Sequence, residues 1–424
     1  MFDGSEGGTV NRQVVIVGGG LVGLTTAFFA ADLGCDVTVI DHGPLGGGAA
    51  RGNAGYVCPT LCAPLAAPGQ LASALKSLRD PTRALRVRPR AIPELVGWFG
   101  WFAKASTPRA YREARLALAR FAMKSPGLLD MLAAAGVSVE RSPEIIQVFH
   151  DAKAAEHMLA DVRMVAELGL TMPDRVLDGA AVRALVPALT KHVTAGYVIP
   201  GDRAIDPRRY VDSLVQVLQS RGVRLVEHAA IDRFDTRQSR ITGVLTSAGR
   251  FDGDEYVLAA GAGSGRLGRK LGLSLHVVPG QGYNVGLPVN DGLRHPVMFE
   301  EVHAVSTPLH DRIRLGGTME FTGHTTTFDP RRVDAILRSM IPYADLDWTA
   351  GFEPWAGPRP MSPDGLPAIG RPRRWANLTV GAGHGMFGLT LAPATGKAIA
   401  DIVTTGAHPE DLTAFDPDRF RLRP

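Results

Sequence analysis

The N-terminal pattern of apolar and polar positions predicts a strand, a turn, a helix and a second strand. Residues 14–17 form a short β-branched apolar run that a triple glycine ends. Residues 21–33 then carry Ala, Leu and Phe at helical spacing and stop at Gly34, and residues 36–40 form a second β-branched run. One βαβ unit is therefore expected over residues 14–41.

The rest of the chain changes pattern several times. Residues 43–69 are rich in Gly, Ala and Pro without clear periodicity, which is typical of an ordered functional loop. Residues 70–190 show a mostly helical pattern, strongest over residues 109–136. A second α/β signal starts near Asp206. It predicts helices over 210–218 and 331–340 and after residue 388, and strands over 223–226, 231–235, 241–246, 256–258, within 276–330 and over 378–380.

Glycine and proline are over-represented in the composition. The 49 Gly and 30 Pro make up 79 of 424 residues, or about 19%, against an ordinary share of about 12%. Disorder is not expected, because hydrophobic residues are 45% and charged residues only 21% of the chain. The length fits two or three domains, or one large cofactor domain with an insertion. A net charge of +4 is too small to indicate a nucleic-acid partner.

Cysteine use and the N-terminus indicate a reducing, cytoplasmic location. Cys35, Cys58 and Cys62 are too few for a disulfide framework, and no further Cys/His pair accompanies them, so no metal site is expected. Residues 1–10 lack the basic and apolar regions of a signal peptide and are expected to form a flexible tail.

Gly18, Gly20 and Gly23 have the spacing G-x-G-x-x-G between a strand and a helix, and Asp41 ends the next strand. This arrangement is typical of a dinucleotide site. The glycines permit a tight turn, close approach of the backbone to a pyrophosphate, and close packing of helix on strand. The phosphates lie at the helix N-terminus and the carboxylate binds ribose hydroxyls. A membrane span is excluded here, because a triple-glycine turn and a second strand interrupt the uncharged stretch.

A second glycine loop, Gly381-x-Gly383-His384-Gly385-x-x-Gly388, precedes the C-terminal helix. Such a loop can direct N–H groups at a partially negative carbonyl, such as the pyrimidine end of a reduced flavin. A simple helix-entry turn is the alternative. Because only one full fingerprint is present, the residues alone leave FAD and NAD open.

Five segments together resemble the FAD-dependent D-amino-acid oxidase superfamily, and within it the bacterial D-amino-acid dehydrogenases, with glycine oxidase and hydroxyproline dehydrogenases as relatives. The matching segments are residues 14–41, Asn53-Ala54-Gly55 with the Pro-rich loop after it, 258–263, 312–317, and 355–370 followed by 381–401. The last of them reads W-x-G-x-R-P-M-x-P-D-G-x-P-x-I-G and then G-H-G-x-x-G, and it is the most specific. The resemblance covers the chain from Val14 onward.

The resemblance implies non-covalently bound FAD. Residues 53–55 would lie beside the isoalloxazine, and the loop at His384 would cap its pyrimidine edge. The Thr-Ser that the family has before Asn-Ala-Gly is Ala49-Ala50 here, so a hydroxyl contact is missing and backbone or Arg51 must replace it. The expected cofactor-binding residues are Gly18, Gly20, Leu21, Val22, Gly23, Asp41, His42, Arg51, Asn53, Ala54, Gly55, Ile231, Ala260, Gly261, Arg359, His384, Gly385, Met386, Phe387 and Gly388.

Arg359 is expected to bind the substrate carboxylate. The family uses the matching arginine in this way, and a guanidinium can form two parallel charge-assisted hydrogen bonds to a carboxylate. Prolines on both sides hold the residue. His303 and Tyr283 are further candidate catalytic residues, with a structural histidine and a core tyrosine as the alternatives.

Two surface features leave a membrane contact open. The aromatic residues within 98–102 are expected to form the buried face of a helix, with a membrane interface as the alternative. The basic run over residues 79–90 is expected to be a solvated face, with a patch for a membrane or an acidic partner as the alternative. Relatives of this kind are often peripheral membrane proteins at the inner face of the cell membrane.

The implied fold is α/β, with a discontinuous Rossmann-type FAD-binding domain (11–90, 201–275 and 355–424). An α+β substrate domain on a mostly antiparallel sheet is expected from 91–200 and 276–354. The implied reaction oxidises the Cα–N bond of a D-amino acid to an imino acid, with O2 or a quinone as electron acceptor. A cyclic or secondary amine, a specialised metabolite, and a catalytically silent flavin-binding subunit are the alternatives, and the oligomeric state stays open.

Overall fold

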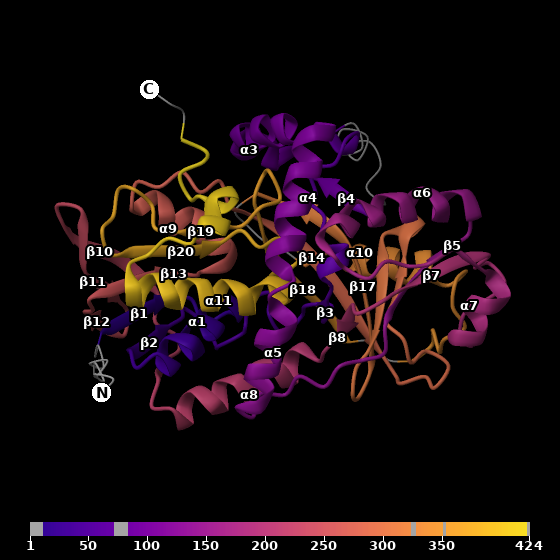
Figure 1. Ribbon diagram of the computed structural model, residues 1–424, viewed down its shortest axis with the longest axis horizontal. Coiled ribbons are helices and arrows are strands. Elements are labelled where there is room, and N and C mark those ends of the chain that lie inside the picture. The colour runs from indigo at the N-terminus through magenta and orange to yellow at the C-terminus, as the bar shows by residue number, and fades with distance from the viewer. Residues whose placement is uncertain (1–11, 72–83, 324–327, 351–352, 422–424) are drawn as a thin grey trace, which may run out of the picture.

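The computed structural model describes residues 12–71, 84–323, 328–350 and 353–421. The expected N-terminal tail and the basic residues Arg79 and Arg83 lie outside them. The chain forms two large sheets side by side, each covered by helices (Figure 1). Segments distant in sequence build each sheet, so the chain passes between them several times.

The first sheet has six strands in the order β19-β20-β13-β1-β2-β9. The β1 strand (Gln13–Val17) pairs in parallel with β2 (Asp36–Ile40) and β13 (Glu255–Leu258), which confirms the predicted βαβ unit. The other members are β9 (Arg224–Val226), β19 (Ala368–Gly370) and β20 (Leu378–Ala382). A separate three-stranded sheet contains β10 (Ile231–Arg237), β11 (Arg240–Thr246) and β12 (Gly249–Phe251). Parallel strands buried on both faces require continuous apolar runs, and β1 and β13 have them.

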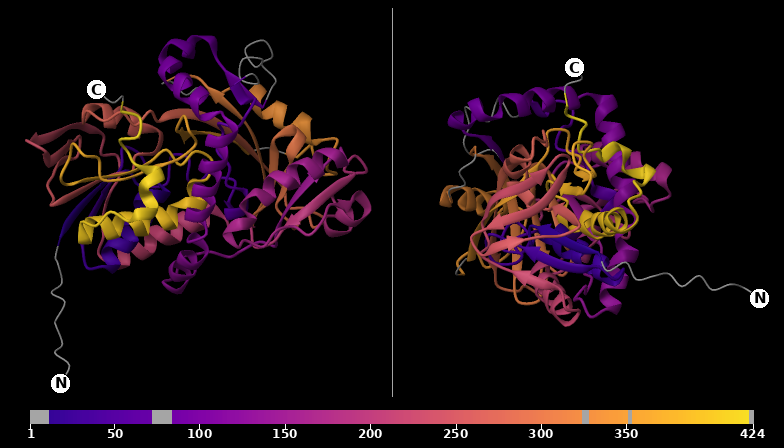
Figure 2. Two further views of the ribbon diagram at one scale, coloured as in Figure 1. Left: turned by 45° about the horizontal axis from the view of Figure 1, so that its top comes forward. Right: turned by 90° about the vertical axis from the view of Figure 1, so that its left-hand side faces the viewer.

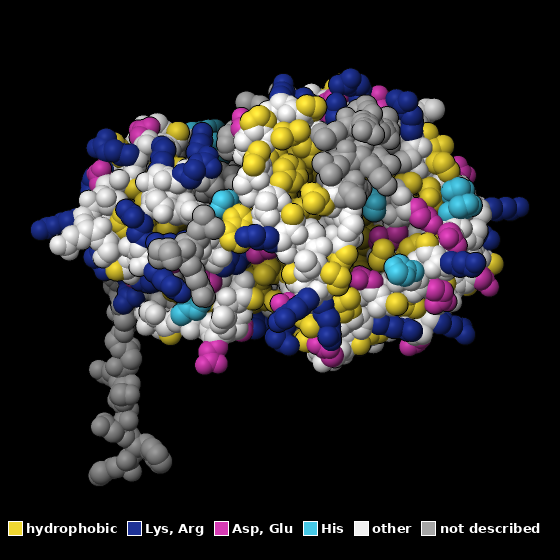
Figure 3. All heavy atoms as spheres, turned by 90° about the horizontal axis from the view of Figure 1, so that it is seen from above, with side chains coloured by type: hydrophobic (Ala, Val, Ile, Leu, Met, Phe, Trp, Pro, Cys, Tyr) yellow, Lys and Arg dark blue, Asp and Glu magenta, His cyan; other side chains and the backbone are white. Residues whose placement is uncertain are grey.

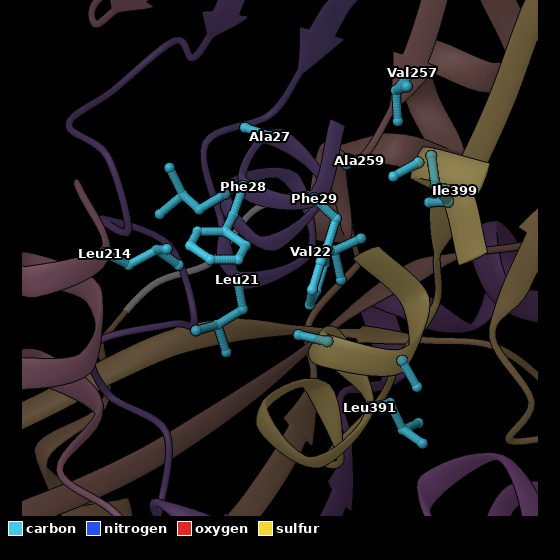
Figure 4. Packing of buried hydrophobic residues seen from close by; sticks show 14 of the residues in the cluster. Leu21, Val22, Ala27, Phe28, Phe29, Leu214, Val257, Ala259, Leu391 and Ile399 are labelled. Atoms are coloured by element: carbon cyan, nitrogen blue, oxygen red, sulfur yellow. The ribbon is translucent and has the colours of Figure 1, made fainter. Parts of the chain in front are cut away.

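Helices α1 (Leu21–Asp32) and α11 (Gly388–Thr405) pack against each other beside the first sheet, although they come from opposite ends of the chain (Figure 2). A Cβ at Gly396 would lie 2.6 Å from the carbonyl carbon of Thr25, so the two backbones nearly touch. Thr25 Oγ1 also donates to the carbonyl of Ala392 at 2.9 Å. Figure 4 shows Val22 and Phe29 of α1 in the same apolar cluster as Leu391 and Ile399 of α11. Helices α8 (Pro207–Ser220) and α9 (Ser264–Lys270) complete this part.

The second sheet has nine strands, mostly antiparallel, in the order β18-β14-β17-β16-β15-β5-β7-β6, with β4 paired to β17. The strands are β4 (Leu85–Val87), β5 (Ile145–Phe149), β6 (Leu177–Asp178), β7 (Ala195–Ile199), β14 (Val278–Leu287), β15 (Val297–Phe299), β16 (Ala304–Pro308), β17 (Ile313–Phe321) and β18 (Glu353–Met361). Helix α10 (Pro330–Met340) packs on it. Two very short strands, β3 (Tyr56–Val57) and β8 (Arg203–Ala204), pair separately.

The mostly helical pattern expected over residues 70–190 is only partly right. Strands β4, β5 and β6 lie in this segment, and β5 is buried at every position, which removes the alternation that identifies a strand. The signal over 109–136 is two helices, α4 (Pro108–Ala122) and α5 (Ser125–Ala134). Pro126 explains the break, because its ring would clash with the carbonyl of residue 122 in a continuous helix. The remaining helices are α3 (Ile92–Ala105), α6 (Ala152–Val162), α7 (Gly179–Leu185) and short 3-10 turns at Pro59–Leu61, Pro89–Ala91, Arg163–Leu168, Gly261–Gly263, Glu300–Val302 and Glu410–Phe415.

Packing and ion pairs account for part of the two features that left a membrane contact open. Trp98 is 3% exposed and stacks on Phe102 inside a buried cluster, as expected for an inward helix face. Arg86 and Arg88 pair with the buried carboxylates of Glu320 and Asp329, so the expected solvated face is wrong for these two residues, whereas Arg90 of the same run is exposed. Figure 3 shows Lys and Arg spread over several parts of one face. Among the described helices, none combines the length and apolar character needed to cross a membrane.

Candidate functional site

A cavity of about 1600 Å³ lies between the two sheets and receives residues from both. The carboxyl ends of β1, β2 and β13 open into it on one side, and β16, β17 and β18 line it on the other. Single small-molecule pockets usually measure about 300–1,000 Å³. The cavity therefore has room for an extended ligand together with a small substrate.

The turn after β1 has the geometry that the glycine fingerprint predicts. Gly18 has φ +115°, and a Cβ there would lie 2.3 Å from the carbonyl oxygen of Ala259. Gly20 has no protein atom within 4 Å of its Cβ direction and lines the cavity together with Leu21 and Val22. No side chain caps the first turn of α1, so its N–H groups are available to an anion.

Gly23 lies outside the cavity lining and acts in packing. A Cβ at this position would lie 1.8 Å from the carbonyl oxygen of Gly18. Its expected role in close contact between helix and strand is consistent with this position.

Asp41 is held at the end of β2 by backbone donors. Its carboxylate accepts hydrogen bonds from the N–H groups of Gly19 at 2.7 Å and Gly43 at 2.9 Å, and it contacts His42 Nδ1 at 3.1 Å. Burial alone would raise the pKa of Asp41, but the hydrogen bonds from His42, Gly43 and Gly19 outweigh it and lower the pKa below its ordinary value. The carboxylate is therefore charged at neutral pH. Asp41 and His42 both line the cavity, as do Ile231, Ala260 and Gly261 nearby.

The loop after β2 lines the cavity at Asn53 and Ala54, whereas Arg51 and Gly55 are not part of the lining. Arg51 Nη1 instead binds Asp212 of α8 at 2.5 Å, so the expectation that its guanidinium replaces the missing hydroxyl is not supported. Gly55 has φ +91° and packs its backbone against the carbonyl oxygen of Ile205. Nothing in the sequence indicates this ion pair, because Asp212 lies on a helix distant in the chain.

The second glycine loop brings His384, Gly385, Met386, Phe387 and Gly388 to the cavity, where α11 begins. His384 is 3% exposed, and its Nε2 lies 2.9 Å from Thr395 Oγ1. Burial lowers the pKa of His384 to about 3, so the ring is neutral at physiological pH. The N–H of Gly385 donates to the carbonyl of Pro360 at 2.9 Å, which ties the loop to β18.

Arg359 projects from β18 into the cavity. Its Nη1 donates to the carbonyl of Thr318 at 3.5 Å, and its guanidinium lies over Gly282, where a Cβ would be only 2.7 Å from Arg359 Cζ. Burial lowers the pKa of Arg359 to about 10, so the group is still charged at neutral pH. No carboxylate within the described part of the chain forms an ion pair with Arg359. A ligand carboxylate would therefore compensate the charge of a half-buried guanidinium.

The two other candidate catalytic residues differ in position. His303 lines the cavity, has φ +50°, and has a pKa that burial lowers. Tyr283 is 1% exposed, belongs to the apolar cluster of the second sheet and contacts the Phe328 ring, with a centroid distance of 6.0 Å. Tyr283 is absent from the cavity lining, a position that the core alternative fits better than the predicted catalytic role. A strand residue at one position can face either the core or a cavity, and only the sheet decides which.

Three contacts beside the cavity were not predicted from the sequence. Asn284, Thr307 and Arg314, on three strands of the second sheet, donate to backbone carbonyls of residues 52–54. Glu300 also lines the cavity and accepts a hydrogen bond from Gln147. Burial raises the pKa of Glu300 to about 7. Only Arg314 carried a sequence signal, as a member of the segment 312–317.

These observations fit a bound dinucleotide. The cavity has a volume of about 1600 Å³, a helix N-terminus without a cap faces it at Gly20, and an anionic carboxylate stands at the end of β2. A Cβ at Gly18 would overlap backbone, so this close-packed turn depends on glycine. The residues of the second glycine loop also line the cavity.

The fold and site define an FAD-dependent oxidoreductase. A family model described as FAD dependent oxidoreductase matches residues 13–402, and the chain belongs to this family. FAD and the α/β fold implied by the resemblance are thereby confirmed.

Curated relatives match along nearly the whole chain. A D-amino acid dehydrogenase of Methylobacterium nodulans is 36% identical over 94% of this chain and 96% of its own. A D-amino acid dehydrogenase of Bradyrhizobium diazoefficiens is 34% identical over 97% and 99%. Among solved structures, glycine oxidase from Geobacillus kaustophilus has a TM-score of 0.74 at 23% identity, covering 97% of this chain and 100% of that one. Iminodiacetate oxidase from Chelativorans sp. has the same TM-score and identity, covering 95% and 98%.

Proposed function

We propose that the protein oxidises the Cα–N bond of a D-amino acid. The Cα–H bond breaks with its electron pair, a proton leaves the nitrogen, and the resulting imino acid is hydrolysed to a 2-oxo acid and ammonia. Bound FAD supplies the two-electron acceptor for the hydride. The observation that carries the proposal is Arg359, a charged guanidinium in the cavity wall without a carboxylate partner among the described residues. The names of the curated relatives support the same substrate class.

Arg359 would bind the substrate carboxylate through two parallel N–H donors and so fix the direction of the Cα–H bond. Its contact with the carbonyl of Thr318 restricts the guanidinium before the substrate arrives. The amine would react in its neutral form, so the proposal assigns no general base. The N–H groups near Gly388, at the start of α11, would favour negative charge at that end of the cavity.

The residues proposed to hold FAD follow the lining of the cavity. Those near Gly18 and Gly20 would bind the pyrophosphate, Asp41 the ribose, and Asn53 and Ala54 would border the isoalloxazine. The two-domain division also stays a proposal. Strands β4 and β18 join the second sheet although residues 85–87 and 355–361 belong to the segments assigned to the cofactor domain.

Arg359→Ala tests the proposal directly. The variant should keep its bound flavin, seen in the visible absorption spectrum, while KM for the D-amino acid rises by about 100-fold or more, because a charge-assisted bidentate contact is lost. The KM of Arg359→Lys should lie between those of the wild type and Arg359→Ala, since the ammonium group of lysine cannot form two parallel hydrogen bonds. A near-normal KM in Arg359→Ala would refute the role of this residue.

Anaerobic bleaching of the flavin across a panel of D-amino acids, their L-enantiomers, D-proline and hydroxyproline would define the substrate. Bleaching by cyclic amines alone would favour the secondary-amine alternative. No bleaching by any member, together with a co-purifying chain, would favour a silent subunit. Peroxide release in air would identify O2 as the electron acceptor, and its absence with turnover of an added quinone would identify a quinone.

A further inference from the structure

Polar side chains from the second sheet hold three consecutive backbone carbonyls of the loop after β2. The donors come from β14, β17 and β16, and the acceptors are successive residues of the cavity lining. The contacts are Asn284 Nδ2 to Gly52 O at 2.8 Å, Arg314 Nη1 to Asn53 O, and Thr307 Oγ1 to Ala54 O at 2.7 Å.

The register of the sheet explains why three donors meet three adjacent carbonyls. Thr307 lies directly opposite Arg314 in the pairing of β16 with β17. Gly286 of β14 is opposite Arg314, and Asn284 is two residues away from it on the same face. The three strands are neighbours about 4.8 Å apart, so a loop that crosses them can offer one carbonyl to a donor on each strand.

The three donor side chains are buried, and burying them costs free energy unless each one forms its hydrogen bond. Arg314 is 3%, Thr307 0% and Asn284 6% exposed. Burial lowers the pKa of Arg314 to about 10, and its guanidinium binds a neutral carbonyl of the loop. A buried polar group without its hydrogen bond destabilises the fold, which means that the sheet and the loop are matched to each other.

Further contacts of the loop also restrict its conformation. Asn53 Oδ1 accepts from the N–H of Gly55 at 2.8 Å, and the N–H of Asn53 donates to Ala50 O at 3.1 Å. A Cβ at Gly52 would lie 2.3 Å from the ring of Trp355. Residues 52–54 therefore have little freedom while the three sheet contacts are made.

We propose that Asn284, Thr307 and Arg314 are positioning residues for FAD: by holding the carbonyls of residues 52–54, the second sheet sets the shape of the loop that borders the isoalloxazine. The inference rests on the proposed placement of the flavin ring along this loop and is independent of the substrate. It makes the affinity for the flavin half of the cofactor depend on a sheet outside the dinucleotide fold.

Thr307 offers a matched pair of variants. Thr307→Val keeps the shape and removes the hydroxyl, whereas Thr307→Ser keeps the hydroxyl. FAD release from the diluted holoprotein, measured by ultrafiltration, should give a Kd about tenfold higher for Thr307→Val and within about twofold of wild type for Thr307→Ser. ADP, which matches only the adenosine half, should compete for the site with an unchanged inhibition constant in both variants.

Arg314→Met on β17 and Arg312→Met just before that strand form a second pair. Arg312 binds Asp311 and Glu353 and does not contact the loop, so only Arg314→Met should weaken FAD binding, by tenfold or more, with ADP unaffected. An unchanged FAD Kd in Thr307→Val would overturn the proposal, and so would equal weakening of FAD and ADP, which indicates general damage. Because the readout is cofactor binding, an absence of D-amino-acid turnover would leave this test intact.

Discussion

Gly282 has no side chain, and the guanidinium of Arg359 occupies the space that a side chain would need. A Cβ at this position would be 2.7 Å from both Cζ and Nε of Arg359 and 2.9 Å from Nη2. The obstructed atoms are the end of a flexible side chain, so a methyl group would displace the guanidinium and leave the backbone in place. Gly282 therefore affects substrate binding more than stability.

We predict that Gly282→Ala raises KM for the amino acid by roughly 10- to 100-fold, because a displacement of about 1 Å is enough for such a loss. Flavin content and the melting temperature should stay close to those of the wild type. Gly286→Ala is the matched control on the same strand and face, since its nearest neighbour is 3.5 Å from the new Cβ. An unchanged KM in Gly282→Ala, alongside a raised KM in Arg359→Ala, would show that the guanidinium adapts freely.

Among the elements, the pair α1 and α11 connects the two ends of the chain and presents both N-termini to the cavity. Gly396 permits this crossing, because a Cβ would lie 2.6–2.8 Å from backbone and side-chain atoms of Thr25 and from the backbone nitrogen of Thr26. Backbone cannot move aside as a side chain can. The two helices would have to separate, and with them the two glycine loops.

We predict that Gly396→Ala lowers the free energy of unfolding by about 1–3 kcal/mol, as overpacking of a well-packed core does. Gly100→Ala on α3 is the control: nothing lies within 4 Å of its Cβ, so the better helix propensity of Ala should stabilise by about 0.5–1 kcal/mol. Urea unfolding of the two holoproteins measures both effects. Equal stability of the two variants would contradict this account of the crossing.

For the whole molecule, the dependence of stability on pH is the sum of buried groups with opposite trends. Burial raises the pKa of Asp202 and of Glu300 to about 7, and it lowers the pKa of His384 to about 3. Between about pH 4 and 7 the folded protein retains protons on the two acids that the unfolded chain has lost, so their contribution to stability falls as pH rises. The contribution of His384 to stability is instead lost as pH falls below about 6.5, because the unfolded chain then binds a proton that the folded protein does not.

We predict that Asp202→Asn removes the part of this pH dependence of stability that comes from Asp202. Asp202 is 2% exposed and accepts a hydrogen bond from the N–H of Thr60 at 3.3 Å, which an amide oxygen can also accept. Relative to wild type, the variant should gain roughly 1–3 kcal/mol in unfolding free energy between pH 5 and pH 8. Parallel curves for the two proteins over this range would mean that the Asp202 pKa is not raised.

The features that could be predicted from the sequence are those that depend on residues close together in the chain. Gly18, Gly20 and Gly23 set a backbone turn, Asp41 follows a strand, and the helix after His384 begins at a glycine loop. These features are local, since conformational freedom at glycine and the alternation of apolar runs can be evaluated within one segment. Arg359 could be selected because it stands in a specific contiguous motif.

Contacts between side chains that are distant in the sequence became known only from the folded structure. It paired Arg51 with Asp212, placed Tyr283 in the core, and brought Asn284, Thr307 and Arg314 to one loop. The period of a strand indicates two faces but names neither its partner strand nor its register, and a shift of one residue would turn each of these side chains to the other face. The order β14-β17-β16 and its register are therefore what bring these scattered polar residues to one loop of the cavity.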